Sequence, residues 1–112
     1  MQTYEMAKLL TDEYATKIVI GTLKQPKSAI QLSRELGIPI AACYRRIKHL
    51  ERAGLLKCVN KVLTKKGKRV ALYSSQLKNA HIFFEDGKVM VKVEFLNGIT
   101  KDFVTNSQNS IH

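Results

Sequence analysis

The chain has 112 residues, of which 45% are hydrophobic, and a formal net charge of +10. This is enough material for one globular domain with one modest core. No apolar run approaches the roughly 20 residues of a membrane-spanning helix, and the N-terminus lacks the basic-then-apolar pattern of a signal peptide, so we expect a cytoplasmic protein without membrane contact. Two cysteines at unrelated spacing provide neither a disulfide framework nor a paired metal-ligand motif.

The positive charge is concentrated in the middle of the chain. Residues 37–75 contain ten lysines and arginines and one acidic residue, a balance of +9. Residues 1–36 have five bases and four acids, and residues 76–112 have four of each. This distribution predicts a surface that binds a polyanion, although a merely solvated basic face is the alternative.

The N-terminal third predicts three helices. Residues 1–10 form a short leading helix, and Thr11 is the expected cap of a second helix that ends before Pro26. Ser28 is the expected cap of a third helix over residues 29–36.

The next residues predict a helix-turn-helix. Gly37 is the expected left-handed cap, Ile38 fills the turn, and Pro39 starts a fourth helix that runs to about residue 53. Its positions 43, 47 and 50 follow one helical face and point to the core. The opposite face is therefore free to enter a DNA major groove.

We predict that five outward residues of this recognition helix, residues 39–53, read DNA bases: Ile40, Ala41, Tyr44, Arg45 and Lys48. Three flanking side chains of the helix, together with the third helix's cap, are predicted phosphate contacts: Arg46, His49, Arg52 and Ser28. The alternative is a surface helix whose arginines are only solvated.

Residues 57–63 and 70–74 alternate as two strands joined by a cationic turn. Like charges crowded at a hairpin tip have little structural use, but they suit the DNA backbone. We therefore interpret residues 64–69 as a wing whose phosphate contacts are Lys65, Lys66, Lys68 and Arg69.

The last third predicts a three-stranded meander over about residues 79–105. Tight turns at Asp86-Gly87 and Asn97-Gly98 would place Glu85 opposite Lys88 and Glu94 opposite Lys101, which gives two cross-strand ion pairs. One face is too apolar to leave in water. We predict that it forms a homodimer interface made of Ile82, Phe84, Val89, Val91, Val93 and Phe95. The competing interpretation packs this face, which also contains Ala80, onto the first helix of its own chain.

The predicted fold is thus α+β: a winged helix-turn-helix with N-terminal helices, a basic wing hairpin and a C-terminal antiparallel β-meander. The expected organisation is a DNA-binding domain over residues 1–75, a meander extension over residues 76–105 and a flexible tail over residues 106–112.

The stretch from Leu36-Gly-Ile-Pro to Leu50-Glu-Arg-Ala-Gly-Leu-Leu resembles the recognition-helix block of ArsR-like winged helix-turn-helix regulators, particularly archaeal ones. The likeness covers roughly residues 9–75 and implies a DNA-binding repressor or activator that forms a homodimer. The thiol-rich metal-sensing box of the arsenic and cadmium sensors has no counterpart between residues 29 and 36. The resemblance therefore does not imply metal sensing.

No motif for chemistry appears: there is no glycine-rich phosphate loop, nucleophile elbow or Cys-x-x-Cys pair. A zinc site from Cys43, Cys58, His49 and His81 is disfavoured relative to buried thiols. We expect no enzyme, no cofactor and no metal. The expected function is a sequence-specific regulator bound to double-stranded DNA, and the alternative is a winged-helix module for protein assembly or RNA.

Overall fold

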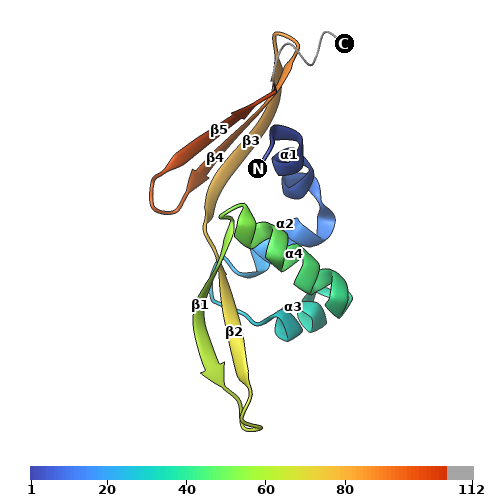
Figure 1. Cartoon of the computed structure of the whole chain (residues 1–112), viewed down its shortest axis with the longest axis vertical. Helices are drawn as coiled ribbons and strands as arrows, with labels where there is room; N and C mark the ends of the chain where they lie inside the picture. The colour runs from blue at the N-terminus through green and yellow to red at the C-terminus, as the bar shows by residue number, and fades with distance from the viewer. Residues whose placement is uncertain (106–112) are drawn as a thin grey trace.

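A computed structural model describes residues 1–105 as four helices followed by five strands. The helices are α1 (Thr3–Thr11), α2 (Glu13–Gly21), α3 (Ala29–Leu36) and α4 (Ile40–Arg52). The strands are β1 (Leu56–Leu63), β2 (Arg69–Ser75), β3 (Leu77–Glu85), β4 (Lys88–Phe95) and β5 (Thr100–Val104). The predicted α+β winged helix-turn-helix is confirmed (Figure 1). The predicted tail, residues 106–112, lies outside the described residues.

The molecule is elongated, with extents of 57 × 29 × 18 Å. The helices lie in the middle, the β1–β2 hairpin (the wing) projects from one end, and the β3–β5 sheet (the arm) projects from the other (Figure 1). No helix among residues 1–105 is long and apolar enough to cross a membrane.

Local capping signals set the helix boundaries. The Ser28 side chain accepts a hydrogen bond from the Gln31 backbone N–H at 3.1 Å, as expected of an N-cap. The predicted cap of α2 is wrong by one residue: Thr11 ends α1, and Asp12 caps α2 by accepting from the Ala15 N–H at 2.8 Å. Because α1 and α2 meet at this residue, a carboxylate is fixed between them.

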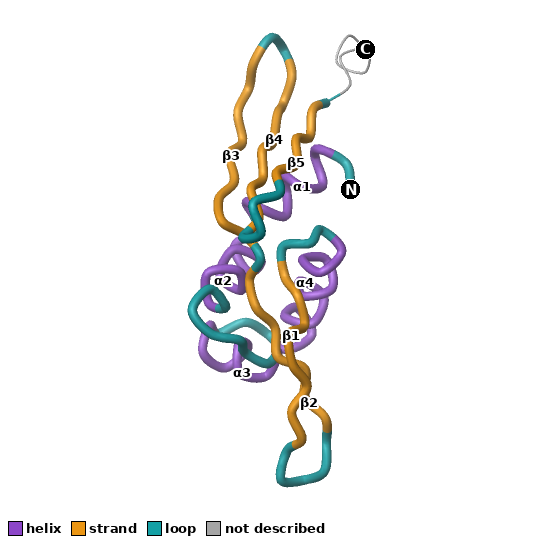
Figure 2. Tube along the Cα trace, turned by 90° about the vertical axis from the view of Figure 1, so that its left-hand side faces the viewer, coloured by secondary structure: helices purple, strands orange, loops and turns teal. Residues whose placement is uncertain are grey.

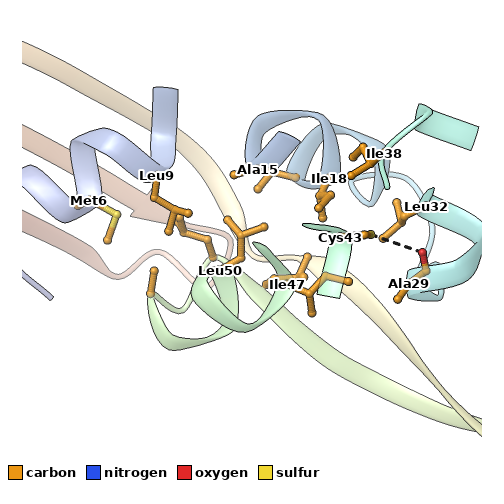
Figure 3. Packing of buried hydrophobic residues seen from close by; sticks show 14 of the residues in the cluster. Met6, Leu9, Ala15, Ile18, Ala29, Leu32, Ile38, Cys43, Ile47 and Leu50 are labelled. Atoms are coloured by element: carbon orange, nitrogen blue, oxygen red, sulfur yellow. Dashed lines mark hydrogen bonds between the residues drawn. The ribbon is translucent and has the colours of Figure 1, made fainter. Parts of the chain in front are cut away.

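One hydrophobic core joins the helices to the arm. Ile18 of α2, Leu32 of α3 and Ile47 of α4 are almost fully buried and lie side by side (Figure 3). Met6 and Leu9 of α1 continue the same cluster toward the arm (Figure 3). Residues of the arm belong to this cluster too, so the core includes residues from both predicted segments of the chain, 1–75 and 76–105.

The wing is pinned to the helices at its base. β1 and β2 pair antiparallel from Leu56↔Ser75 to Leu63↔Arg69, with one irregularity between Cys58 and Asn60. Lys27 forms a bridge to Tyr73, with backbone N–O distances of 3.0 and 2.8 Å. Because Lys27 directly precedes the cap of α3, this bridge fixes the wing relative to the helix-turn-helix.

The first hairpin of the arm has the predicted register, including Glu85↔Lys88 and Phe84↔Val89. Its turn residues Asp86 and Gly87 both have positive φ, as a tight two-residue turn requires.

The second hairpin is shifted by one residue from the prediction. Glu94 faces Thr100, not Lys101, because the loop has three residues, with Phe95 N–H bonded to the Ile99 carbonyl at 2.8 Å. Gly98 takes the left-handed position at the end of that loop. Glu94 instead contacts Lys78 at 3.6 Å, and neither predicted cross-strand ion pair forms within residues 1–105.

Half of the predicted dimer interface is already covered by the same chain. Val91, Val93 and Phe95 are buried in the core with Met6 and Leu9 of α1. The prediction is therefore wrong for these three residues, and the competing interpretation, packing on the chain's own first helix, is correct for them. The helix α1 packs mainly against β4 and β5, so Ile82 and Phe84 on β3 stay exposed, and Val89 is half-buried.

Candidate nucleic-acid interface

The recognition helix α4 is held rigidly by its inner face. Cys43, Ile47 and Leu50 are buried as predicted, and the Cys43 thiol contacts the Ala29 carbonyl oxygen at 3.5 Å (Figure 3). Burial raises the pKa of this thiol, which favours its neutral form. The α3–α4 turn has Gly37 at φ 67° and Ile38 almost fully buried, so the two helices are locked at a fixed angle.

The outer face of α4 contains all five residues predicted to read bases. Arg45 and Lys48 are exposed near the middle of the helix, and Tyr44 is 47% exposed. Ile40 and Ala41 extend this face toward the N-terminus of the helix. The face thus combines a guanidinium, an ammonium, a phenol and small apolar groups, which are suited to base edges and thymine methyl groups.

The tip of the wing presents four exposed cations. Lys65, Lys66, Lys68 and Arg69 surround a turn in which Gly67 N–H donates to the Thr64 carbonyl at 2.9 Å and Gly67 has φ 77°. No ion pair within residues 1–105 involves these four side chains. Their charge is therefore available to an external anion.

Arg46 lies on a flank of α4, as the sequence predicts, but its side chain is engaged within the chain. Its guanidinium donates to both carboxylate oxygens of Asp12, at 2.9 and 3.2 Å, and lies 5.6 Å from the centre of the Tyr14 ring. The hydrogen bonds from Arg46 hold the pKa of Asp12 below its ordinary value. Arg46 thus joins α4 to the start of α2, and this ion pair competes with the phosphate contact predicted for it.

The two other predicted phosphate contacts of α4 lie on the side of the helix that faces α1. His49 and Arg52 line a hollow of about 380 Å³ between α1 and α4, together with Arg45 and Lys8. Lys8 was not predicted, because nothing in its local sequence indicates that α1 lies beside α4. Ser28 is half-buried and its oxygen is used as the cap of α3.

The two flanks of α4 face different neighbours. Arg46 on one flank meets α2, whereas Tyr44 and Glu51 lie on the flank toward β2, close enough to influence Tyr73. The pKa of Tyr73 is raised, mainly by burial. The base of the wing therefore lies beside one flank of α4.

No group of three His, Cys, Asp or Glu side chains in the described part of the chain is arranged to hold a metal ion. Cys43 lies in the core and Cys58 lies on the wing, half-exposed.

Residues 19–59 are similar to a family described as a helix-turn-helix domain. The match runs from the end of α2 to the start of β1 and so includes the whole α3–turn–α4 unit. No curated protein matches the chain.

Proposed function

We propose that this protein is a transcriptional regulator, ArsR-like in type, that binds double-stranded DNA sequence-specifically. The observation that carries the proposal is the exposed set Tyr44, Arg45 and Lys48 on the outer face of a helix whose inner face is fully packed. A major groove about 12 Å wide admits one such helix. The similarity of residues 19–59 to helix-turn-helix domains supports this use of α4.

Arg45 is the central reading residue of the proposal. It is exposed, it has no ion-pair partner within residues 1–105, and it lies one helical turn after Ala41 and nearly one before Lys48. A guanidinium can donate two hydrogen bonds to guanine O6 and N7, which is the commonest base-specific contact. Lys48 and Tyr44 would contact neighbouring base pairs.

The wing supplies affinity rather than specificity. Lys65, Lys66, Lys68 and Arg69 are flexible exposed cations, and such side chains bind phosphates without reading sequence. His49 and Arg52 would contact the backbone at the edge of the reading face. Arg46 is left out of this set because Asp12 holds it.

The base-reading role is tested with Arg45→Ala. Binding sites are first selected from fragments of the source genome, and affinity is then measured by fluorescence anisotropy for a selected site and for random DNA. We expect a loss of about 1–3 kcal/mol on the selected site and a smaller loss on random DNA. Lys92→Ala, which removes an exposed cation on the arm, is the matched control. Equal weakening on both DNAs would contradict base reading by Arg45.

The wing is tested by the salt dependence of binding. Replacing both Lys66 and Arg69 by alanine should lower the slope of log K against log salt by about two, since each phosphate contact contributes about one. A Lys88/Lys92 double alanine variant removes the same charge from the β3–β4 hairpin of the arm and should leave the slope unchanged. An unchanged slope in the wing variant would remove the wing from the interface.

An RNA duplex of equal length is included as a competitor in both experiments. Preferential binding of RNA would support an RNA-binding module in place of the regulator.

The proposal also includes a homodimer, because two recognition helices read two half-sites of an operator with more contacts than one helix offers. The β4 part of the predicted sheet face cannot form it, since Val91, Val93 and Phe95 are buried within the chain, whereas Ile82 and Phe84 of β3 remain exposed.

A further inference from the structure

The strand β3 is an edge of the arm and has an uncovered apolar side. The strand order is β3-β4-β5, so among residues 1–105 β3 has a neighbouring strand on one side only (Figure 2). Phe84 is 82% exposed, more than any other large hydrophobic residue of residues 1–105, and Ile82 is 37% exposed. β3 contains no proline, and its one lysine, Lys78, lies at the base of the strand, so residues 79–85 lack the residues that commonly protect an edge strand from pairing.

The backbone of β3 presents a regular set of hydrogen-bonding groups at this edge. In a two-residue hairpin the flanking pair Glu85 and Lys88 exchanges hydrogen bonds, and the direction then alternates along each strand. The alternation agrees with β4, whose Val89 carbonyl and Phe95 N–H bond toward β5. The N–H and C=O groups of Ala80, Ile82 and Phe84 therefore point away from β4, to the open edge.

An apolar groove runs along the inner side of the same strand. It has a volume of about 350 Å³ and lies where α1 and α2 meet the base of β3. Its lining is apolar except for Thr16, and Ala80 and Ile82 of β3 form one wall. On the opposite wall Ile20 is 68% exposed. The groove and the exposed Phe84 are thus neighbours on one strand.

We propose that β3 pairs antiparallel with β3 of a second copy of the chain, about a twofold axis at Ile82. Residue numbers that face each other then add up to 164, so Ala80 faces Phe84 of the partner subunit. Each Phe84 side chain would lie beside the partner's groove, and the open backbone groups of both strands would bond to each other. Such a dimer forms one continuous six-stranded sheet, and it would exist whether or not α4 reads DNA.

The charges at the two ends of β3 favour a second copy as the occupant. In this register Asn79 faces Glu85 of the partner subunit, and Lys78, which contacts Glu94 of its own chain at 3.6 Å but is 60% exposed, lies near Asp86 of the partner subunit. A strand that is positively charged at one end and negatively charged at the other is complementary to a second copy of itself in antiparallel pairing. With the axis moved one residue to His81, Phe84 would instead face Lys78 of the partner subunit. The axis at Ile82 keeps apolar residues opposite each other.

The first test measures self-association without DNA. Analytical ultracentrifugation of the wild-type chain should show a dimer at micromolar concentration, and Phe84→Ser should raise its dissociation constant at least tenfold. Because Phe84 is exposed in the single chain, the substitution should leave the circular dichroism spectrum unchanged. Leu96→Ser, at a residue that is 57% exposed at the other end of the arm, is the matched control and should not change the dissociation constant.

The second test locates the axis by cross-linking in a Cys58→Ser background. Hydrogen-bonded antiparallel partners have Cα atoms about 5.5 Å apart, within disulfide reach, so Ile82→Cys should give a covalent dimer on oxidation. Phe83→Cys should not give a covalent dimer, because the two copies of residue 83 are offset diagonally across the strand pair and lie too far apart for a disulfide. A wild-type monomer at 100 µM, or cross-linking through Phe83→Cys in place of Ile82→Cys, would overturn the proposal. Neither measurement involves DNA, so these outcomes are separate from those of the DNA-binding experiments.

Discussion

Arg46 is one of the predicted phosphate contacts of α4, and its ion pair with Asp12 determines whether its side chain contacts DNA or stabilises the fold. Two hydrogen bonds, at 2.9 and 3.2 Å, connect the recognition helix to the residue that separates α1 from α2. We predict that Arg46→Ala reduces the free energy of unfolding and leaves the salt dependence of DNA binding unchanged.

The expected magnitude follows from the geometry. Exposed ion pairs contribute about 0.2–1 kcal/mol, whereas breaking a buried one costs about 3–5 kcal/mol. The side chains of Arg46 and Asp12 are 24% and 26% exposed, and their contact is bidentate, so this pair lies between those limits. We expect a coupling energy of about 1–2 kcal/mol.

A double-mutant cycle isolates this pair from the capping role of Asp12. Asp12 also accepts a hydrogen bond from the Ala15 N–H, and losing a cap costs about 1 kcal/mol. Asp12→Ser retains a capping oxygen but not the charge, so it is a better partner for Arg46→Ala than Asp12→Ala is. The four proteins are compared by urea denaturation followed by circular dichroism.

The pH dependence gives an independent check. Arg46 lowers the pKa of Asp12 in the folded protein, so the ionised carboxylate stabilises the fold. Its contribution is complete above the ordinary aspartate pKa of about 3.9 and is lost as the pH falls through the lowered value. The stability difference between wild type and Arg46→Ala should therefore be constant near neutral pH and shrink below about pH 4. A coupling energy near zero, with a salt slope lowered by about one in Arg46→Ala, would refute the structural role.

Two further predictions concern the core and the cysteines. Val91→Ala should reduce the free energy of unfolding by about 2 kcal/mol, because it removes two buried methyl equivalents and leaves a cavity. Val104→Ala, at an exposed position, should change the free energy of unfolding by less than about 0.5 kcal/mol. Equal losses in urea denaturation would contradict the packing of the arm on α1. The Cys43 thiol, buried and with a raised pKa, should react with a thiol reagent at least tenfold more slowly than Cys58 in the native protein, and equal rates would mean that α4 opens readily.

The helix-turn-helix and the wing could be predicted from the sequence because their signals are local. Ser28 caps the residues directly after it, Gly37 provides a left-handed residue, and Pro39 marks the start of α4 at a fixed distance. The helical repeat places Cys43 and Ile47 inward, so the exposure of Arg45 follows from its own position in the chain. The Asp86-Gly87 turn determines the register of the first arm hairpin in the same way.

Tertiary structure decided the features that depend on which surfaces meet. Asp12 lies 34 residues from Arg46, and no local pattern indicates that the two side chains share a hydrogen bond. The Asn97-Gly98 pair suits both a two-residue and a three-residue loop, and packing of Phe95 into the core accompanies the longer one. The alternation of the arm shows that one face must be covered, but α1 covers it mainly over β4 and β5, and Leu77 and Ala80 at the base of β3 also pack against the core. Periodicity defines the faces of a strand, whereas the element that packs on each face depends on the path of the whole chain in space, and this is why the outer part of β3, with Ile82 and Phe84, is left open.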